Sequence, residues 1–252
     1  MQSDISNDRV RTNKQHWDAI SARDWPKKAH LRKQIRNGAP YLEKMEPKIA
    51  PYLRDITGKK VIVLQFGDAL VLLACAKKGA VVTGVDFSSE QVRLAREAAT
   101  YCGVDVDLIE ADCQNLPKSI PNAHFDLAVA ECGVFIWIEN LDAWMRNAYR
   151  VLRSGGKLIV SDFHPLSTIS KETDGALTFR KSYFDQQPEI YQPEENAPPA
   201  VEFLWKISDI VNAAVGTGFQ IDRVEEYYVE QKAKKVPLIP TDFLLIATKG
   251  LT

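Results

Sequence analysis

Two aspartates, Asp86 and Asp112, have the residue type and the setting to hold a nucleoside. Asp86 ends a strand–turn–helix–strand pattern, which opens with the apolar run 61–64, turns at Gly67 and has its helix ended by Gly79. A helix that starts after such a turn offers free N–H groups, and the acid can accept both hydroxyls of a ribose. Asp86 follows Gly67 by about twenty positions, the spacing typical of a ribose-binding acid. The pattern predicts a nucleotide-binding βαβ unit, with an ordinary tight turn and a helix-capping acid as the alternative.

Asp112 follows the third predicted strand, in the loop before Leu116 and Pro117. A carboxylate accepts several hydrogen bonds at once, so it suits both amino and hydroxyl donors. The alternative is an Asx turn, in which the side chain bonds its own backbone. The first turn carries only one glycine, Gly67, so the G-x-G-x-x-G signature of nicotinamide-binding enzymes is absent. A nicotinamide-dependent oxidoreductase is therefore a less favoured alternative.

The rest of the chain alternates short apolar runs with helical segments. The predicted strands are 61–64, 81–86, 104–110, 125–131, 157–163, 219–228 and 243–248. The predicted helices between them are 69–78, 88–102, 141–152 and 206–216. No crossover helix fits between the last two strands, so they must pair antiparallel. The pattern predicts an α/β fold with a doubly wound, seven-stranded, mostly parallel sheet and a C-terminal antiparallel hairpin.

Residues 1–57 read as an N-terminal helical cap that precedes the sheet. Thr12 or Asn13 could cap its first helix, which carries Trp17, and a later helix carries Tyr41. Such a cap would lie across the open ends of the strands, where ligands bind in these sheets. Packing in the core is the alternative for both aromatic rings.

Residues 58–252 are expected to form a single catalytic domain. Within it, about 164–205 is rich in proline and polar residues and interrupts the alternation of strands and helices. We expect this segment to be a lid-like insertion that brings Tyr183 toward a substrate.

Composition excludes several partners and compartments. The net charge of −1 over 252 residues gives no electrostatic reason to bind nucleic acid or an anionic membrane. No apolar run approaches the roughly twenty residues that a membrane span needs. The four cysteines form no C-x-x-C pair and have no histidine at metal spacing. The simplest expectation is a reduced, cytoplasmic protein without a metal or disulfides, whose oligomeric state stays open.

Four blocks of the sequence resemble class I S-adenosylmethionine-dependent methyltransferases that act on small molecules. They are VIVLQFGDALVLLACAKKGAVVTGVDFS, IEADCQNLP, FDLAVAECGVFIWIENLDAWMRNAYRVLRSGGKLIVSDFHP and WKISDIVNAAVGTGFQIDRVEE. The first block is most similar to bacterial members whose loop begins L-Q-C, which would account for Gln65. The resemblance implies S-adenosylmethionine as the cofactor and in-line methyl transfer to a small-molecule acceptor.

The resemblance also implies which residues hold the cofactor. Its methionine half would contact Gln65, Gly67 and Asp68, and its ribose would contact Asp86. Its adenine would contact Phe87, Asp112 and Cys113. Its sulfonium would lie beside the backbone of Glu131 and Cys132. Three positions depart from the family: Val63 replaces an acid, Phe66 a small residue and Ala69 the last glycine. A positive φ at Ala69 would cost on the order of 1 kcal/mol. The departures leave an alternative, a methyltransferase-fold protein with weakened or lost catalysis that serves as a binding or regulatory module.

Methyl transfer needs alignment and exclusion of water more than acid–base chemistry. A base helps where the acceptor must lose a proton, and His164, directly after the fifth strand, is the best placed of the four histidines. A structural histidine bonded at the strand end is the equal alternative. Trp17, Tyr41 and Tyr183 are the candidates for contact with the acceptor.

Overall fold

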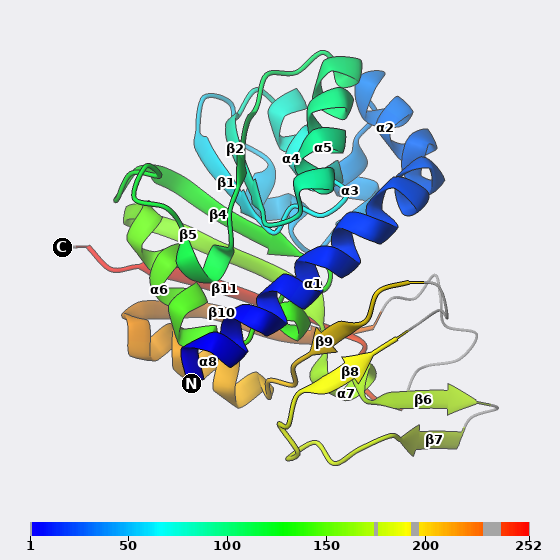
Figure 1. Ribbon diagram of the computed structural model, residues 1–252. Helices are drawn as coiled ribbons and strands as arrows, with labels where there is room; N and C mark the ends of the chain where they lie inside the picture. Colours follow the sequence, from blue (N-terminus) through cyan, green and yellow to red (C-terminus); the bar gives the residue numbers. More distant parts are fainter. Residues whose placement is uncertain (1, 174–175, 193–196, 229–237, 252) are drawn as a thin grey trace.

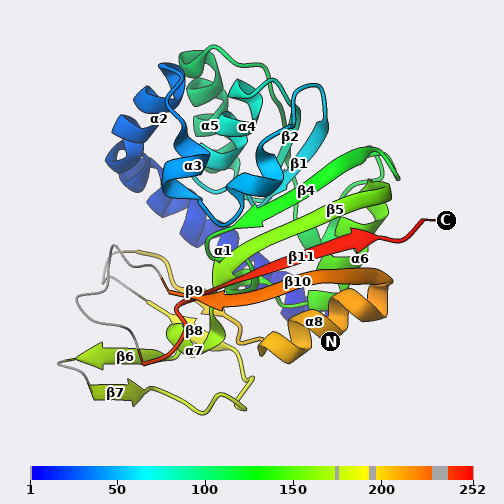
Figure 2. The same ribbon diagram turned by 180° about the vertical axis from the view of Figure 1, so that it is seen from behind.

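The computed structural model describes residues 2–173, 176–192, 197–228 and 238–251. At its centre is a seven-stranded sheet in the order β10-β11-β5-β4-β1-β2-β3 (Figures 1 and 2). These strands are β1 (Lys60–Leu64), β2 (Val81–Asp86), β3 (Asp107–Glu110), β4 (Phe125–Glu131), β5 (Leu152–Phe163), β10 (Phe219–Tyr227) and β11 (Asp242–Lys249). The strands β1 to β5 pair in parallel, whereas β11 runs antiparallel to both β5 and β10. The predicted fold class, including the closing hairpin, is confirmed.

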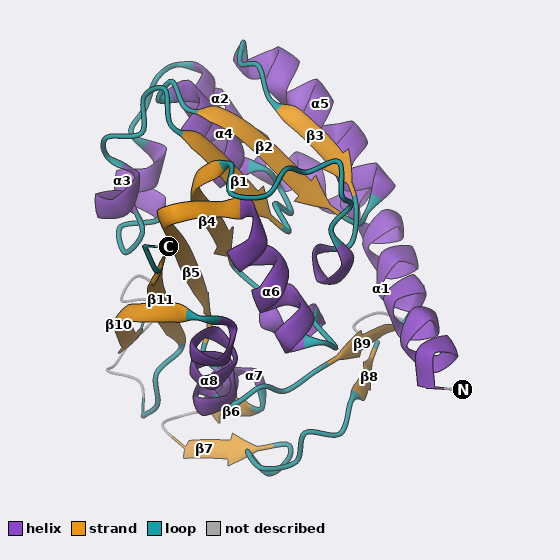
Figure 3. Cartoon of the chain, turned by 90° about the vertical axis from the view of Figure 1, so that its left-hand side faces the viewer, coloured by secondary structure: helices purple, strands orange, loops and turns teal. Residues whose placement is uncertain are grey.

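Strand β1 shows why its sequence is an unbroken apolar run. Val61 and Val63 belong to the core on one face of the sheet, and Ile62 and Leu64 belong to the core on the other. Because both faces are covered, neither set of alternating side chains meets water. The helices α4 (Leu70–Lys77) and α5 (Ser89–Cys102) contribute to the first core, and α6 (Leu141–Val151) and α8 (Ile207–Thr217) to the second (Figure 3).

Capping groups set the helix boundaries. The side chain of Ser88 accepts the N–H of Gln91 at 3.1 Å and so caps α5. Gly79 and Gly103 follow α4 and α5 with φ of +83° and +65°. The third strand is shorter than predicted, because the N–H of Val104 still bonds the end of α5.

The N-terminal region is helical, as expected, but its first helix starts much earlier than the sequence indicated. Helix α1 (Gln2–Asp24) is continuous through Thr12 and Asn13, so neither residue is its cap. The Asn13 side chain instead donates to the carbonyl of Val201 at 3.0 Å and accepts the N–H of Val201 at 2.6 Å. Because the backbone of Val201 satisfies the side-chain amide of Asn13, this residue can lie within the helix and not at its end. The remaining elements of the region are η1 (Trp25–Lys28), α2 (Ala29–Arg36), α3 (Tyr41–Met45) and η2 (Ala50–Leu53).

The segment between β5 and α8 leaves the main sheet. It comprises α7 (Pro165–Thr168), β6 (Ser170–Thr173), β7 (Ala176–Phe179), β8 (Glu189–Tyr191) and β9 (Ala200–Glu202). The strands β6 and β7 form one antiparallel hairpin, and β8 and β9 form another beside α1 (Figure 1). Two short helices also bear on the site, η3 (Cys113–Asn115) and η4 (Phe135–Trp137). Within the described ranges, none of the helices has the length and apolarity that crossing a bilayer requires.

Candidate cofactor and acceptor site

Two cavities adjoin at the carboxyl ends of β1, β2 and β4, and both are lined by Gln65 and Trp137. The larger has a volume of about 540 Å³ and the smaller about 20 Å³. Predicted cofactor residues that line the larger cavity are Gln65, Gly67, Asp68, Glu131 and Cys132. Those that line the smaller are Gln65, Phe87, Asp112 and Cys113. The fold therefore brings eight of the nine residues to one continuous region.

The ninth residue, Asp86, is buried at the tip of β2 and supports the first loop. Its Oδ2 accepts the N–H of Gly67 at 3.1 Å, and its Oδ1 accepts the N–H of Ser88 at 3.0 Å. Burial raises the pKa of Asp86 to about 6, although the two N–H groups act in the opposite direction. Each carboxylate oxygen can accept a further hydrogen bond, so hydroxyl donors fit this group.

The loop between β1 and α4 is built from left-handed residues. Gln65, Gly67 and Ala69 have φ of +54°, +50° and +61°. Ala69 thus has the positive φ that costs an L-residue on the order of 1 kcal/mol. The side chain of Gln65 is held by the protein: its Oε1 accepts the indole N–H of Trp144 at 2.8 Å, and its Nε2 donates to the carbonyl of Val134 at 3.2 Å.

The bulky Phe66 in this loop is accommodated by a glycine on the neighbouring strand. A Cβ on Gly84 would lie 2.8 Å from a ring carbon of Phe66 and 2.2 Å from Cδ1 of Leu72. Gly84 therefore gives the ring its space. Val63, which stands where the family has an acid, is buried in the core and offers no polar group to a ligand.

Acidic side chains gather around Lys28, which lines the larger cavity. Lys28 of η1 forms an ion pair with Asp68, and Glu131 and Glu46 lie close to both. Burial, followed by repulsion from neighbouring carboxylates, raises the pKa of Glu46 to about 7 and that of Glu131 well above its usual value. A cation bound beside Glu46 and Glu131 would lower both pKa values and so favour their ionised forms.

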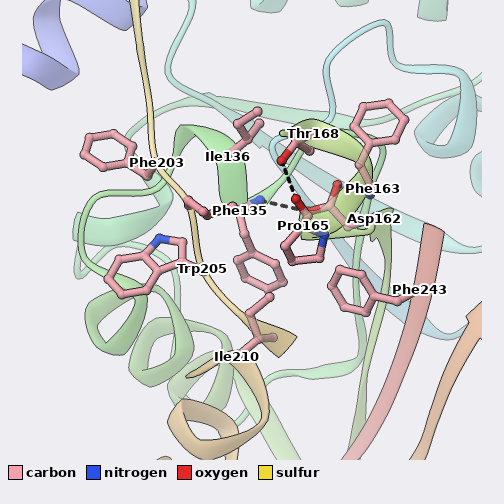
Figure 4. A pocket seen from close by; sticks show the side chains of 11 residues that line it. Phe135, Ile136, Asp162, Phe163, Pro165, Thr168, Phe203, Trp205, Ile210 and Phe243 are labelled. Atoms are coloured by element: carbon pink, nitrogen blue, oxygen red, sulfur yellow. Dashed lines mark hydrogen bonds between the residues drawn. The ribbon is translucent and has the colours of Figure 1, made fainter. Parts of the chain in front are cut away.

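Asp162, near the end of β5, is a site residue that sequence reasoning missed. Its buried carboxylate accepts four backbone N–H groups at 2.6–3.0 Å, from Gly133, Val134, Phe135 and Phe163. Figure 4 shows the bond from Phe135, at the edge of a small apolar cavity that lies apart from the predicted cofactor residues. These bonds fix the turn after β4, which lines the larger cavity. The sequence feature that could have identified Asp162 is an acid near the end of the predicted strand KLIVSDF.

Residues 64–160 match the family model described as a methyltransferase domain. This chain has a methyltransferase domain. A demethylmenaquinone methyltransferase of Thermus thermophilus is 34% identical over 99 residues, which are 39% of this chain and 44% of that protein. The chain thus matches less than half the length of that relative. An uncharacterized protein of Haemophilus influenzae is 26% identical over 72% of this chain and 75% of its own. An S-adenosylmethionine-dependent methyltransferase of Mesorhizobium loti has the same fold, with a TM-score of 0.65 and 22% identity over 80% of this chain and 97% of its own.

The fold and the family of the methyltransferase domain imply S-adenosylmethionine as its cofactor. The residues present fit that group, because the sulfonium and ammonium are cations and the carboxyl groups of Asp68 and Glu131 line the larger cavity. At the other end, Asp112 lies beside the small cavity, where its Oδ1 accepts the N–H of Gln114 at 2.8 Å. This bond is the Asx turn that the sequence left open. The second oxygen, Oδ2, accepts from Nε2 of Gln114 at 3.4 Å and has the capacity for one further amino donor.

His164 directly follows β5, as predicted, but its ring is occupied. Its Nδ1 accepts the N–H of Leu166 at 3.1 Å and so caps α7, and its Nε2 lies 2.7 Å from a carboxylate oxygen of Glu226. Burial lowers the pKa of His164, although Glu226 acts in the opposite direction. Among the residues that the structure describes, His164 lines neither of the two cavities. The geometry favours the structural alternative over a general base.

Only one of the three residues proposed for the acceptor reaches the larger cavity. Trp17 lines it from α1, whereas Tyr41 is buried in the core with Leu42. The hydroxyl of Tyr183 accepts the N–H of Ile207, the first residue of α8, at 3.2 Å, and so satisfies a free helix N–H. The aromatic residues that sequence reasoning missed in this lining are Phe66, Trp25, Trp137, Phe163 and Tyr191. Their residue type gave no signal, since buried aromatic rings are common in any core.

Proposed function

We propose that this chain is an S-adenosylmethionine-dependent methyltransferase that transfers a methyl group in line to a small-molecule acceptor. One observation carries the proposal: eight of nine residues chosen from the sequence line two adjoining cavities, and the ninth, Asp86, holds the loop between them. An arrangement of unrelated core residues would not converge in this way.

Different residues of the chain would contact different parts of the cofactor. Phe87, Asp112 and Cys113 would hold the adenine, and Asp86 would accept the ribose hydroxyls. Asp68 and Glu131 would face the methionine ammonium and the sulfonium. The bound cofactor supplies the electrophilic methyl group.

Helix α1 contributes by covering the site. Lys14 donates to the carbonyl of Phe87 at 2.8 Å, and Asp18 accepts from the hydroxyl of Ser88 at 2.6 Å. These contacts would hold α1 beside the site, where it would limit the access of water to an in-line displacement. The volume of about 540 Å³ is in the range of sites for small molecules.

A binding or regulatory module with lost catalysis is the second candidate. The strained Ala69 and the apolar Val63 favour it, because both weaken the first loop as a cofactor site. The third candidate function, a nicotinamide-dependent oxidoreductase, is supported by Asp86 alone.

Calorimetric titration with S-adenosylmethionine, S-adenosylhomocysteine and NAD tests the proposal. We expect the two adenosyl compounds to bind and NAD not to bind, and we expect Asp112→Asn to weaken S-adenosylhomocysteine by about tenfold, the loss of one charge-assisted bond. An acceptor screen that follows release of S-adenosylhomocysteine then separates an enzyme from a binding module. A protein that ignores both adenosyl compounds would end the proposal.

A further inference from the structure

One residue in the wall of the larger cavity carries a buried polar atom without a partner. Gln91 of α5 is 5% exposed and lines this cavity together with Gly67. Among the side chains that the structure describes, Oε1 of Gln91 is the single buried nitrogen or oxygen atom that forms no hydrogen bond. Buried polar atoms nearly always have a partner, because an unpaired one costs free energy. A ligand in the cavity can supply the donor that Oε1 lacks.

The bonds of Asp86 explain why this oxygen is unpaired. Ser88 and Gln91 have the spacing of a capping box, in which the side chain at the third helical position accepts the N–H of the capping residue. One half of the box is present, since the Ser88 hydroxyl accepts the N–H of Gln91 at 3.1 Å. The other half is not, because the N–H of Ser88 donates to Oδ1 of Asp86 at 3.0 Å. Asp86 thus takes the donor that Gln91 would otherwise bind.

The same bonds fix the place of Gln91. Its backbone is tied through Ser88 to Asp86. The other oxygen of Asp86 accepts the N–H of Gly67, which lines the same cavity. Gln91 therefore belongs to the β2 side of the cavity, whereas Glu131 ends β4, and β1 separates these two strands in the sheet. A ligand group that meets Gln91 is one that lies near Asp86, the predicted ribose acid.

We propose that Gln91 is a second hydrogen-bond partner of the cofactor's ribose and makes the site select a riboside over a deoxyriboside. The inference rests on the proposed function and adds a binding residue to that same site. The last torsion of a glutamine side chain is broad, so the amide oxygen and nitrogen can exchange places in the cavity wall. A carboxylate only accepts, whereas an amide accepts and donates, as a hydroxyl does. Gln91 thus offers the ribose hydroxyls a donor that Asp86 does not have.

The test combines a change in the ligand with a change in the residue. S-adenosylhomocysteine and its 2′-deoxy and 3′-deoxy analogues are titrated calorimetrically into the full chain and into Gln91→Met. Methionine is close to glutamine in length and helix propensity but has no amide. We expect Gln91→Met to weaken S-adenosylhomocysteine binding about fivefold, the effect of one neutral hydrogen bond. The loss of affinity on deletion of one of the two hydroxyls should be about fivefold smaller in Gln91→Met than in the unaltered chain.

Thermal unfolding distinguishes a ligand partner from a glutamine that only supports the fold. Because Oε1 has no partner in the protein, Gln91→Met should keep or raise the Tm of the chain without ligand. The rise in Tm that S-adenosylhomocysteine causes should be smaller in this variant. Gln220→Met is the control, because Gln220 is exposed on β10, at the edge of the sheet far from β2. It should change neither the affinity nor the effect of deleting a hydroxyl.

Two results would overturn the inference. In the first, both deoxy analogues lose the same factor in Gln91→Met as in the unaltered chain, so the residue meets neither hydroxyl. In the second, the Tm of Gln91→Met without ligand falls by more than about 2 °C, which indicates a partner within the protein. Binding of S-adenosylhomocysteine to the unaltered chain reports separately on the proposed function. If it binds and either result is found, only the role of Gln91 fails; if it does not bind, the methyltransferase proposal itself fails.

Discussion

Oδ2 of Asp86 accepts the backbone N–H of Gly67 at 3.1 Å, so the acid and the glycine of the βαβ pattern are in direct contact. The bond holds the first loop against the tip of β2, where the second oxygen of the same carboxylate holds Ser88 at the start of α5. A single buried side chain thus sets the position of two loops that border the site. Its protonation state then bears on every ligand that needs those loops.

The affinity for S-adenosylhomocysteine should fall at low pH because of Asp86. Its pKa of about 6 means that the free protein carries a neutral carboxyl group below that pH, whereas two ribose hydroxyls need the carboxylate as acceptor. We expect affinity to be constant above about pH 7 and to fall by about tenfold per pH unit well below 6, the limit for one linked proton. Calorimetry between pH 5 and pH 8 measures this.

The same pKa determines how the stability of the protein without ligand changes with pH. Because the folded value lies above the usual value of 3.8, Asp86 favours the folded state at low pH, and that contribution is lost as pH rises through about 6. Asp86→Asn should flatten the affinity profile, whereas Glu46→Gln, which removes a separate group of pKa about 7, should keep its steep limb. An unchanged slope in Asp86→Asn would remove Asp86 from cofactor binding.

Asp162→Asn should disorder the turn after β4. The amide replaces one of two oxygens that accept four N–H groups, and its own N–H₂ would face those donors. We expect a loss of about 3 kcal/mol in the free energy of unfolding in urea, since buried donors left without acceptors cost about 1–3 kcal/mol each. S-adenosylhomocysteine should also bind more weakly, because Cys132 and Gly133 line the larger cavity.

Asp222→Asn is the control for this variant, because Asp222 pairs with Lys157 at a more exposed position and its loss should cost under about 1 kcal/mol. Equal stability of the two variants would show that the four bonds to Asp162 do not hold the turn.

The sequence predicted the sheet, and the places of Asp86 and Asp112 at its carboxyl edge, because both depend on local pattern. The other cofactor residues came from the resemblance to a family, and their role stays a prediction. The apolar run of β1, the cap at Ser88 and the carboxyl-end positions of Asp86 and Asp112 follow from neighbours in the chain. Contacts between distant segments gave no such pattern. Asn13 bonds Val201, 188 positions away, and this pairing rather than a capping motif explains its place in α1.

The same limit applies to the acceptor side. Trp137 and Tyr191 meet only after the segment that follows β5 has packed beside α1. His164 was placed correctly at the strand end, but whether its ring faces the cavity or β10 depends on Glu226, which lies 62 positions later. Residue type and edge position therefore predicted the region, and tertiary packing decided the direction of each side chain.

His164→Ala should lower stability and leave cofactor affinity unchanged. The substitution removes the acceptor that caps α7 and the partner of Glu226, and a lost cap costs about 1 kcal/mol. His164→Asn, which retains a capping oxygen, should recover part of that loss. Urea unfolding and titration with S-adenosylhomocysteine measure the two effects. A general base would give the opposite result, with turnover lost at unchanged stability.

Gly84→Ala should destabilise the protein through the first loop. The added Cβ would lie 2.2 Å from Leu72 and 2.8 Å from Phe66, both of which are buried, so α4 and the loop must shift. Overpacking of this kind typically costs about 1–3 kcal/mol, and the displaced ring should also weaken the binding of S-adenosylhomocysteine.

Gly216→Ala is the control, since an added Cβ there meets nothing within 4 Å and alanine favours the helix α8. The double variant with Leu72→Ala should cost less than the sum of the two single changes, because the methyl group then enters the space that leucine vacates. Strict additivity would mean that Gly84 does not set the packing of Leu72 and Phe66 beneath the loop.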